Sequence, residues 1–134
     1  MDAHIVNAAC AQALSQPMQW GVDDCCKWVA NIIQQATGKD LMEGIAPYGD
    51  RYEALQVIRE YGGHGLHDAA IKMAALHGFP ELRAPFSGDL FGLVPLKEEG
   101  FAIGLFFEGK WLCRNETGVT VLPPDHCLVA WRFM

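Results

Sequence analysis

Residues 20–38 read WGVDDCCKWVANIIQQATG, and this stretch decides the expected fold. Asp23 and Asp24 open a predicted helix, because a carboxylate at a helix start accepts hydrogen bonds from the unpaired N–H groups of the first turn. Apolar side chains then recur with a helical period and make one stripe, at positions 25, 28, 29, 32, 33 and 36. Gly38 ends the pattern, as glycine commonly does after a last helical turn. We therefore expect a helix whose first turn carries Cys25.

The rest of the chain divides into a helical first part and a strand-rich last part. Helical patterns cover about residues 5–14, 51–61 and 66–77. Five short strands follow, separated by turn residues, at about 89–94, 101–107, 110–114, 119–122 and 128–133. This order predicts an α+β domain in which N-terminal helices pack on a C-terminal antiparallel β-meander. Trp28 and Trp131 are assigned to the core between the two layers.

Length and composition favour one ordered domain over residues 1–134, since domains commonly have about 100–150 residues. Hydrophobic residues make up 51% and charged residues 19%, which is unlike a disordered chain. The formal net charge of −6, with scattered lysines, argues against nucleic acid as a partner. No apolar run has the length of a signal peptide or a membrane span, so we expect synthesis in the host cytoplasm and no membrane insertion.

Cys25 is the first candidate for chemistry. A cysteine in the first turn of a helix meets free N–H groups and the positive end of the helix dipole, and both favour the nucleophilic thiolate. Lys27 adds a positive charge nearby, and Asp24 stands directly before the cysteine. Cys25 also lies on the apolar stripe, so a buried core cysteine remains the competing interpretation. The five cysteines, an odd number without a disulfide-framework spacing, fit a reducing compartment.

Several short patterns occur in a fixed order along the chain. Residues 20–26 resemble the nucleophile segment of the NlpC-like papain-fold family, in which an Asp-Cys pair opens the first core helix. Gly88-Asp89-Leu90 and then residues 102–106 resemble the strands that follow in that family. A closer resemblance, to an uncharacterised group of small phage and prophage tail-region proteins, rests on residues 48–52, 61–63, 66, 88–89, 103–104, 118 and 130–132. The resemblance implies a papain-like, NlpC-type single domain with Cys25 at the nucleophile position and Asp24 beside it.

The partner base of that family is missing here. In NlpC-like hydrolases a histidine begins the strand after the Gly-Asp element, and it moves protons to and from the cysteine and the leaving amine. The corresponding position is Ala102, which transfers no proton. Among the other histidines, His126 and His64 are the better candidates for a relocated base, because catalytic groups are assembled in space and not in sequence.

The sequence predicts no cofactor and no metal site. The cysteines and histidines lack the CxxC or HxxxH spacing of zinc ligands, and the glycines at 62, 63 and 65 follow a helix without a phosphate-binding lysine. A redox pair formed by Cys25 and Cys26 is a further alternative, although adjacent cysteines form a strained disulfide.

Two functions are therefore expected. The first is a structural or assembly protein of a phage or prophage tail tip, located in the virion tail and bound to other proteins of the tail tip or hub. It would be a pseudoenzyme that keeps Cys25 and has Ala102 in place of the histidine. The second is an active cysteine peptidase or amidase that cleaves peptide bonds of peptidoglycan during phage entry, with a relocated histidine as base.

Overall fold

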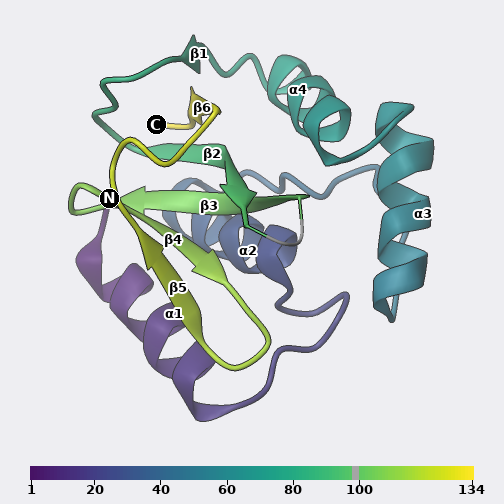
Figure 1. Cartoon of the computed structure of the whole chain (residues 1–134), viewed down its shortest axis with the longest axis horizontal. Helices are drawn as coiled ribbons and strands as arrows, with labels where there is room; N and C mark the ends of the chain where they lie inside the picture. Colours follow the sequence, from purple (N-terminus) through teal and green to yellow (C-terminus); the bar gives the residue numbers. More distant parts are fainter. Residues whose placement is uncertain (98–99) are drawn as a thin grey trace.

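A computed structural model describes residues 1–97 and 100–134 of the chain, and it has an α+β fold (Figure 1). Within these residues, four helices precede a six-stranded antiparallel sheet. The helices are α1 (Ala3–Ser15), α2 (Cys25–Thr37), α3 (Arg51–Gly62) and α4 (Leu66–Leu76). The strands are β1 (Glu81–Leu82), β2 (Leu90–Leu96), β3 (Gly100–Phe107), β4 (Lys110–Arg114), β5 (Val119–Leu122) and β6 (Val129–Arg132). The α+β class predicted from the sequence is confirmed.

Helix α2 has the ends that its sequence predicts. Asp24 is the N-cap, and its side chain accepts a hydrogen bond from the backbone N–H of Lys27. Gly38 ends the helix in the left-handed conformation, with φ of 78°, and its N–H donates to the carbonyl of Gln34. The apolar stripe between these caps is buried against the sheet, and Trp28 belongs to the core as expected. The two caps thereby set Cys25 as the first residue of the helix.

The sheet differs from a simple meander at one edge. Its strand order is β1-β6-β2-β3-β4-β5, so β2 to β5 follow one another as predicted. The last strand instead returns to pair with β2 on one side and with β1 on the other, with Phe91 opposite Trp131. The two-residue strand β1 was not predicted, because it is too short to show an alternating pattern and depends on its pairing with β6.

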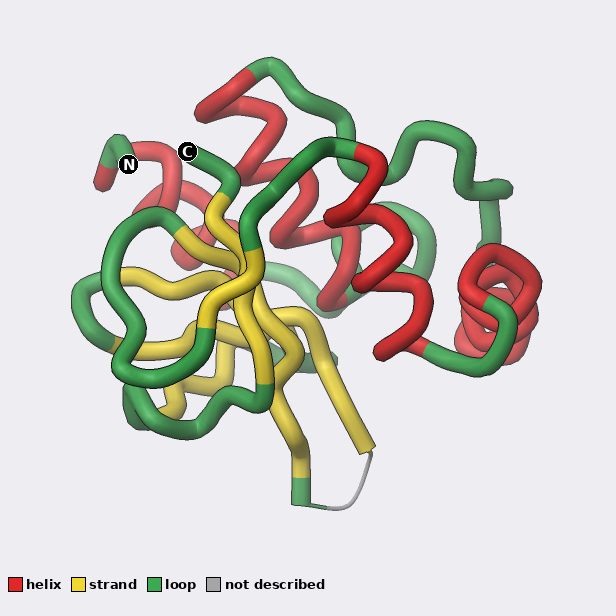
Figure 2. The backbone as a smooth tube through the Cα atoms, turned by 90° about the horizontal axis from the view of Figure 1, so that it is seen from above, coloured by secondary structure: helices red, strands yellow, loops and turns green. Residues whose placement is uncertain are grey.

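Helices cover one face of the sheet, and Figure 2 shows them in red to one side of the yellow strands. Side chains alternate between the faces, so Leu93, Ile103 and Leu105 pack with the helices. The opposite face buries a second, smaller cluster that includes Ala102, Trp111 and Cys113. The sheet thus buries apolar side chains on both faces.

Two glycines that face each other across β2 and β3 leave room in the second cluster. Gly92 is the register partner of Gly104. A Cβ atom on Gly92 would lie 2.7 Å from the sulfur of Cys127 and 2.9 Å from the ring of Trp111. A Cβ atom on Gly104 would lie 3.0 Å from the sulfur of Cys113. The bulky ring and both sulfurs therefore pack directly on the backbone of the sheet.

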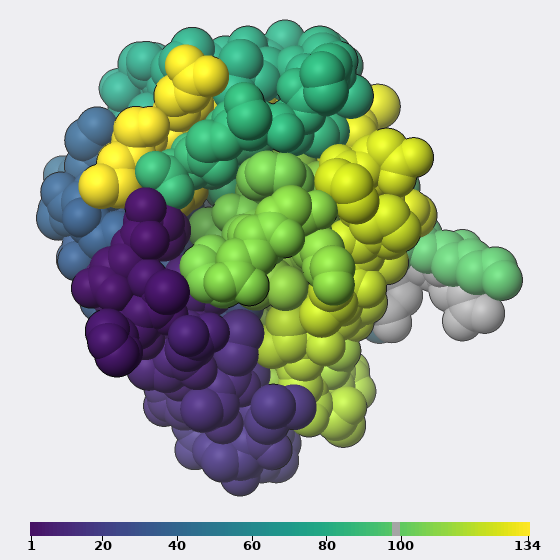
Figure 3. Space-filling model, turned by 90° about the vertical axis from the view of Figure 1, so that its left-hand side faces the viewer, coloured from purple at the N-terminus to yellow at the C-terminus, as the bar shows by residue number. Residues whose placement is uncertain are grey.

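The start of the chain lies against the strands. Helix α1, purple in Figure 3, packs beside β5 at the edge of the sheet. The amino group of Met1 forms an ion pair with Asp89 at 3.2 Å. Across the described residues, no helix combines the length and the apolar character needed to cross a membrane.

Candidate functional site

A groove with a volume of about 550 Å³ opens at the N-terminus of α2. Its floor includes Cys25 and Cys26 from the first turn of α2, together with Ala102 of β3. One wall is formed by α3 and the turn that leads to α4, and the other by the end of β4 and the turn to β5. Segments from four parts of the chain therefore meet around the candidate nucleophile.

Cys25 is half-buried, and the pKa of its thiol is lowered from the ordinary cysteine value. The sulfur lies 4.0 Å from the sulfur of Cys26, and this side-chain contact is the main cause that lowers the pKa of Cys25. The backbone N–H groups of Ile103 and Cys26 lower the pKa as well, whereas burial and the carboxylate of Asp24 raise it. The net shift of the Cys25 pKa is downward, so at a given pH a larger fraction of this thiol is ionised than in an ordinary cysteine.

The pKa values of the other four thiols are raised. The pKa of Cys26 is raised, first by its side-chain contact with Cys25 and then by burial. Burial is the main cause that raises the pKa of Cys10, and it raises those of Cys113 and Cys127 to about 12. All five cysteines are free. Cys25 is therefore the one thiol in which position and electrostatics both favour nucleophilic chemistry.

Asp24 holds the helix start in place. Its side chain is 2% exposed and accepts three hydrogen bonds: from the N–H of Gly21 at 2.8 Å, the N–H of Lys27 at 3.2 Å and the hydroxyl of Tyr48 at 3.0 Å. Gly21 has φ of 81°, and any side chain there would collide with the carbonyl oxygen of Tyr48. Through these contacts Asp24 fixes the start of α2 and so the position of Cys25.

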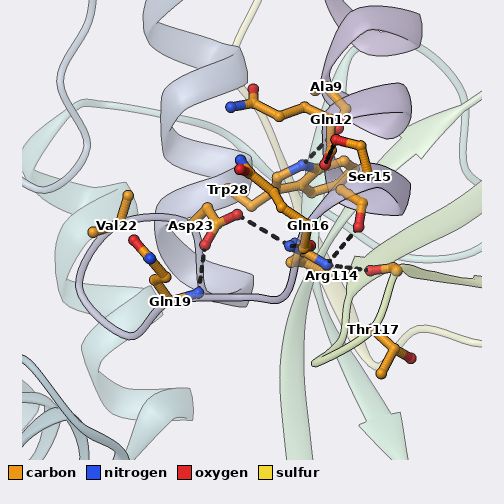
Figure 4. Close-up of polar contacts among 12 residues, drawn as sticks. Ala9, Gln12, Ser15, Gln16, Gln19, Val22, Asp23, Trp28, Arg114 and Thr117 are labelled. Atoms are coloured by element: carbon orange, nitrogen blue, oxygen red, sulfur yellow. Dashed lines mark hydrogen bonds and ion pairs between the residues drawn. The ribbon is translucent and has the colours of Figure 1, made fainter.

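A buried arginine, missed by the sequence analysis, fixes the wall opposite α3 (Figure 4). One terminal nitrogen of Arg114 donates to the carbonyls of Ala13, Asn115 and Gly118, and the other donates to the carbonyl of Gln16. The second nitrogen also pairs with Asp23 at 3.1 Å. The end of α1, the loop before Cys25 and the β4–β5 turn are thus tied to one guanidinium. Arg114 ends an apolar strand segment, which was the available signal for burial.

The histidines are placed very differently from one another. His64 lies in the groove lining, is highly exposed, and its Nδ1 lies 2.9 Å from the carboxylate of Asp68. His126 lies outside the groove lining, and its Nε2 lies 2.8 Å from the carbonyl of Pro95. Among the described residues no histidine is hydrogen-bonded to Cys25. The groove therefore brings together Cys25, Asp24 and His64, but leaves His126 away from them.

Metal chemistry has no evident site. Within residues 1–97 and 100–134, no group of three or more histidine, cysteine, aspartate or glutamate side chains is arranged to hold a metal ion.

The fold and the groove define a small α+β domain in which a cysteine at a helix N-terminus lines an open groove. The chain belongs to the family described as Domain of unknown function (DUF6950), whose model matches residues 3–133. No curated protein and no solved structure matches the chain.

This family corrects the expected relationship to NlpC-like proteins. The family match covers nearly the whole chain and is not to an NlpC or papain family, so that recognition was wrong. The physical reason lies in the motifs used. An aspartate before a cysteine at a helix start, and a Gly-Asp turn before a strand, satisfy general requirements of capping and turns, and many unrelated folds contain them.

Proposed function

We propose that this domain is a structural or assembly protein of a phage or prophage tail tip, and that its groove holds a segment of another tail protein without cleaving it. The observation that carries the proposal is the state of Cys25. Its thiol lines a 550 Å³ groove, Ala102 lies in the same lining, and no described histidine is hydrogen-bonded to the thiol. Cleavage of a peptide bond needs a group that protonates the leaving amine, whereas binding does not.

The finer architecture and the location belong to the same proposal. A helix that begins with a cysteine and packs on an antiparallel sheet supports a papain-like arrangement, without membership of the NlpC family. The protein would be made in the cytoplasm of a bacterial host and incorporated into the virion tail. Its partners would be other proteins of the tail tip or hub, with peptidoglycan as a second contact.

The proposal is tested in a phage or prophage that carries the gene. We expect deletion to stop tail completion, and complementation with the Cys25→Ser variant to restore the yield of infectious particles. Electron microscopy of the lysate and plaque titres give the two readouts. The proposal would be overturned by complete tails in the deletion strain, or by a correctly folded Cys25→Ser protein that restores no infectivity.

A second candidate function is an active cysteine peptidase or amidase that cleaves peptide bonds of peptidoglycan. It is favoured by one observation: the groove contains both Cys25, whose pKa is lowered, and His64, whose ring is held by Asp68. The thiolate would attack the carbonyl carbon, and His64 would protonate the leaving amine. For this step the turn that carries His64 would have to bring the ring to the sulfur.

Digestion of purified cell wall distinguishes the second candidate from the first. A hydrolase would release soluble peptides, and both Cys25→Ser and His64→Ala would abolish the release. His67→Ala serves as the matched control, because His67 lies outside the groove lining. Activity unchanged in His64→Ala would exclude His64 as the base, and no release by the natural protein would exclude the hydrolase altogether.

A further inference from the structure

We propose that the groove recognises an extended peptide segment with the pattern acidic–x–apolar–x–acidic, whose two carboxylates meet Arg51 and Arg59 and whose apolar side chain meets Leu55. This inference rests on the proposed function, because it names the chemistry of the segment that the groove would hold. It concerns the α3 wall of the groove and does not depend on the reactivity of Cys25.

Helix α3 separates its charges by face. At about 100° per residue, Arg51, Leu55 and Arg59 fall within about 80° of one another around the helix axis. Glu53 and Glu60, the acidic residues of the same helix, fall near the opposite side. The structure agrees with this geometry, since Arg51, Leu55 and Arg59 line the groove and the two glutamates do not.

The α3 wall of the groove is locally cationic on an acidic protein. The chain has a formal net charge of −6, yet this wall contributes Arg51 and Arg59 to the groove lining and no acidic residue. The acidic residues of the lining, Asp24 and Glu116, come from other segments, and Arg114 is already paired with Asp23. Among the described residues, neither Arg51 nor Arg59 forms an ion pair with a carboxylate. An acidic ligand is thus favoured at this wall and disfavoured over much of the remaining surface.

The same wall offers apolar surface between the two arginines. Leu55 is 51% exposed, and Phe101, from β3, is 41% exposed in the same groove. Large apolar side chains left accessible inside a hollow gain free energy when a ligand removes them from water. A ligand that carried only carboxylates would leave this surface uncovered, so the preferred ligand has an apolar side chain between its charges.

The distance between Arg51 and Arg59 decides the pattern of the ligand. Arg51 and Arg59 are eight positions apart, which is about 12 Å along a helix axis. An extended peptide advances about 3.3 Å per residue, and every second side chain points to the same face. Acidic side chains four residues apart therefore lie about 13 Å apart on one face. The side chain midway between them then faces Leu55, which stands midway between the arginines.

Capped, fluorescently labelled peptides test the proposal by fluorescence anisotropy with the full chain. The probe is Ser-Glu-Thr-Leu-Thr-Glu-Ser. One control peptide replaces each Glu by Gln, and a second keeps the composition but places the two glutamates side by side. We expect the probe to bind about tenfold more tightly than either control, with a preference that weakens as salt is added.

Variants locate the contact. Arg51→Gln combined with Arg59→Gln should reduce binding of the probe to the level of the Gln peptide. Arg83→Gln, which removes an exposed arginine outside the groove, should change it by less than about twofold. Circular dichroism verifies that each variant is folded.

Equal binding of the Glu and Gln peptides, or full affinity in the double variant, would overturn the acidic preference and leave the groove as a binding site. Failure of all three peptides to bind the natural protein would overturn both the preference and the proposal that the groove holds an extended segment.

Discussion

Cys25 and Cys26 are adjacent in the chain, but their thiols meet different surroundings. Cys25 reaches the groove and receives backbone N–H groups as well as the thiol of its neighbour. Cys26 contacts Cys25 and also lines the groove, but it lines in addition a small apolar cavity of about 60 Å³ between the helices and the sheet. One residue step along the helix thus separates a thiol whose pKa is lowered from one whose pKa is raised.

The Cys26→Ala variant tests this relationship at the scale of single residues. Loss of the thiol donor should raise the apparent pKa of Cys25 and slow its alkylation at pH 7 by about threefold to tenfold, the effect of one hydrogen bond. In the natural protein the rate should rise with pH and level off below the ordinary cysteine value of about 8.5. Mass spectrometry of iodoacetamide-treated folded protein gives the rate for each cysteine. Cys10→Ala is the control, and an unchanged profile in Cys26→Ala would contradict the assignment.

Asp24 and Asp50 provide a matched pair of helix caps. Each accepts a hydrogen bond from its own helix, but Asp24 is buried and also accepts from Gly21 and Tyr48. We expect Asp50→Ala to lower the free energy of unfolding by about 1 kcal/mol, and Asp24→Ala by about 2–4 kcal/mol, because two buried donors lose their acceptor. Urea denaturation measures both. Equal losses would mean that Asp24 acts as an ordinary cap.

At the scale of elements, local sequence patterns predict the helices and most of the strands. The four helices start and end within a few residues of the expected positions, and Trp28 and Trp131 are in the core. The pairing of β6 between β1 and β2 was not predictable, because strand order depends on contacts between distant residues. The groove wall was missed for the same reason: the period of α3 places Arg51 and Arg59 on one face, but only the tertiary structure shows what that face meets.

The crossing of α3 and α4 gives a prediction about elements. A Cβ atom on Gly62 would collide with the backbone nitrogen of Ala69, whereas one on Gly65 would meet nothing within 4 Å. Gly62→Ala should therefore force the two helices apart and lower the free energy of unfolding by about 1–3 kcal/mol.

Gly65→Ala is the matched control for that variant and should leave the stability within about 0.5 kcal/mol. Thermal denaturation followed by circular dichroism compares the two. If Gly62→Ala were as stable as Gly65→Ala, the close helix crossing would not contribute to stability. Because α3 carries the cationic wall, Gly62→Ala should also weaken binding of the acidic peptide.

At the scale of the whole molecule, the candidate site is held together by contacts between segments that are distant in the sequence. Asp24 connects the start of α2 to the loop that contains Tyr48, and Arg114 connects the end of α1 and the loop before α2 to the β4–β5 turn. The sequence indicated the helix and its cysteine. The apolar strand that Arg114 ends was only a weak signal for its burial, because an arginine at the end of a strand is most often exposed. The groove exists only when these distant segments are docked.

The Arg114→Met variant tests that docking. Methionine retains much of the apolar volume but removes every hydrogen bond of the guanidinium, leaving Asp23 and the surrounding carbonyls without their donor. Loss of one partner of a buried ion pair typically costs about 3–5 kcal/mol, so we expect a loss of that size in urea denaturation. Arg83→Met, at an exposed arginine, should change the stability by less than about 0.5 kcal/mol. When Arg114→Met is added to Asp23→Asn, the further loss of stability should be smaller, because no carboxylate charge at position 23 is then left without its partner. A loss below about 1 kcal/mol in Arg114→Met would mean that the segments dock through apolar packing alone, and that the wall opposite α3 does not depend on the buried guanidinium.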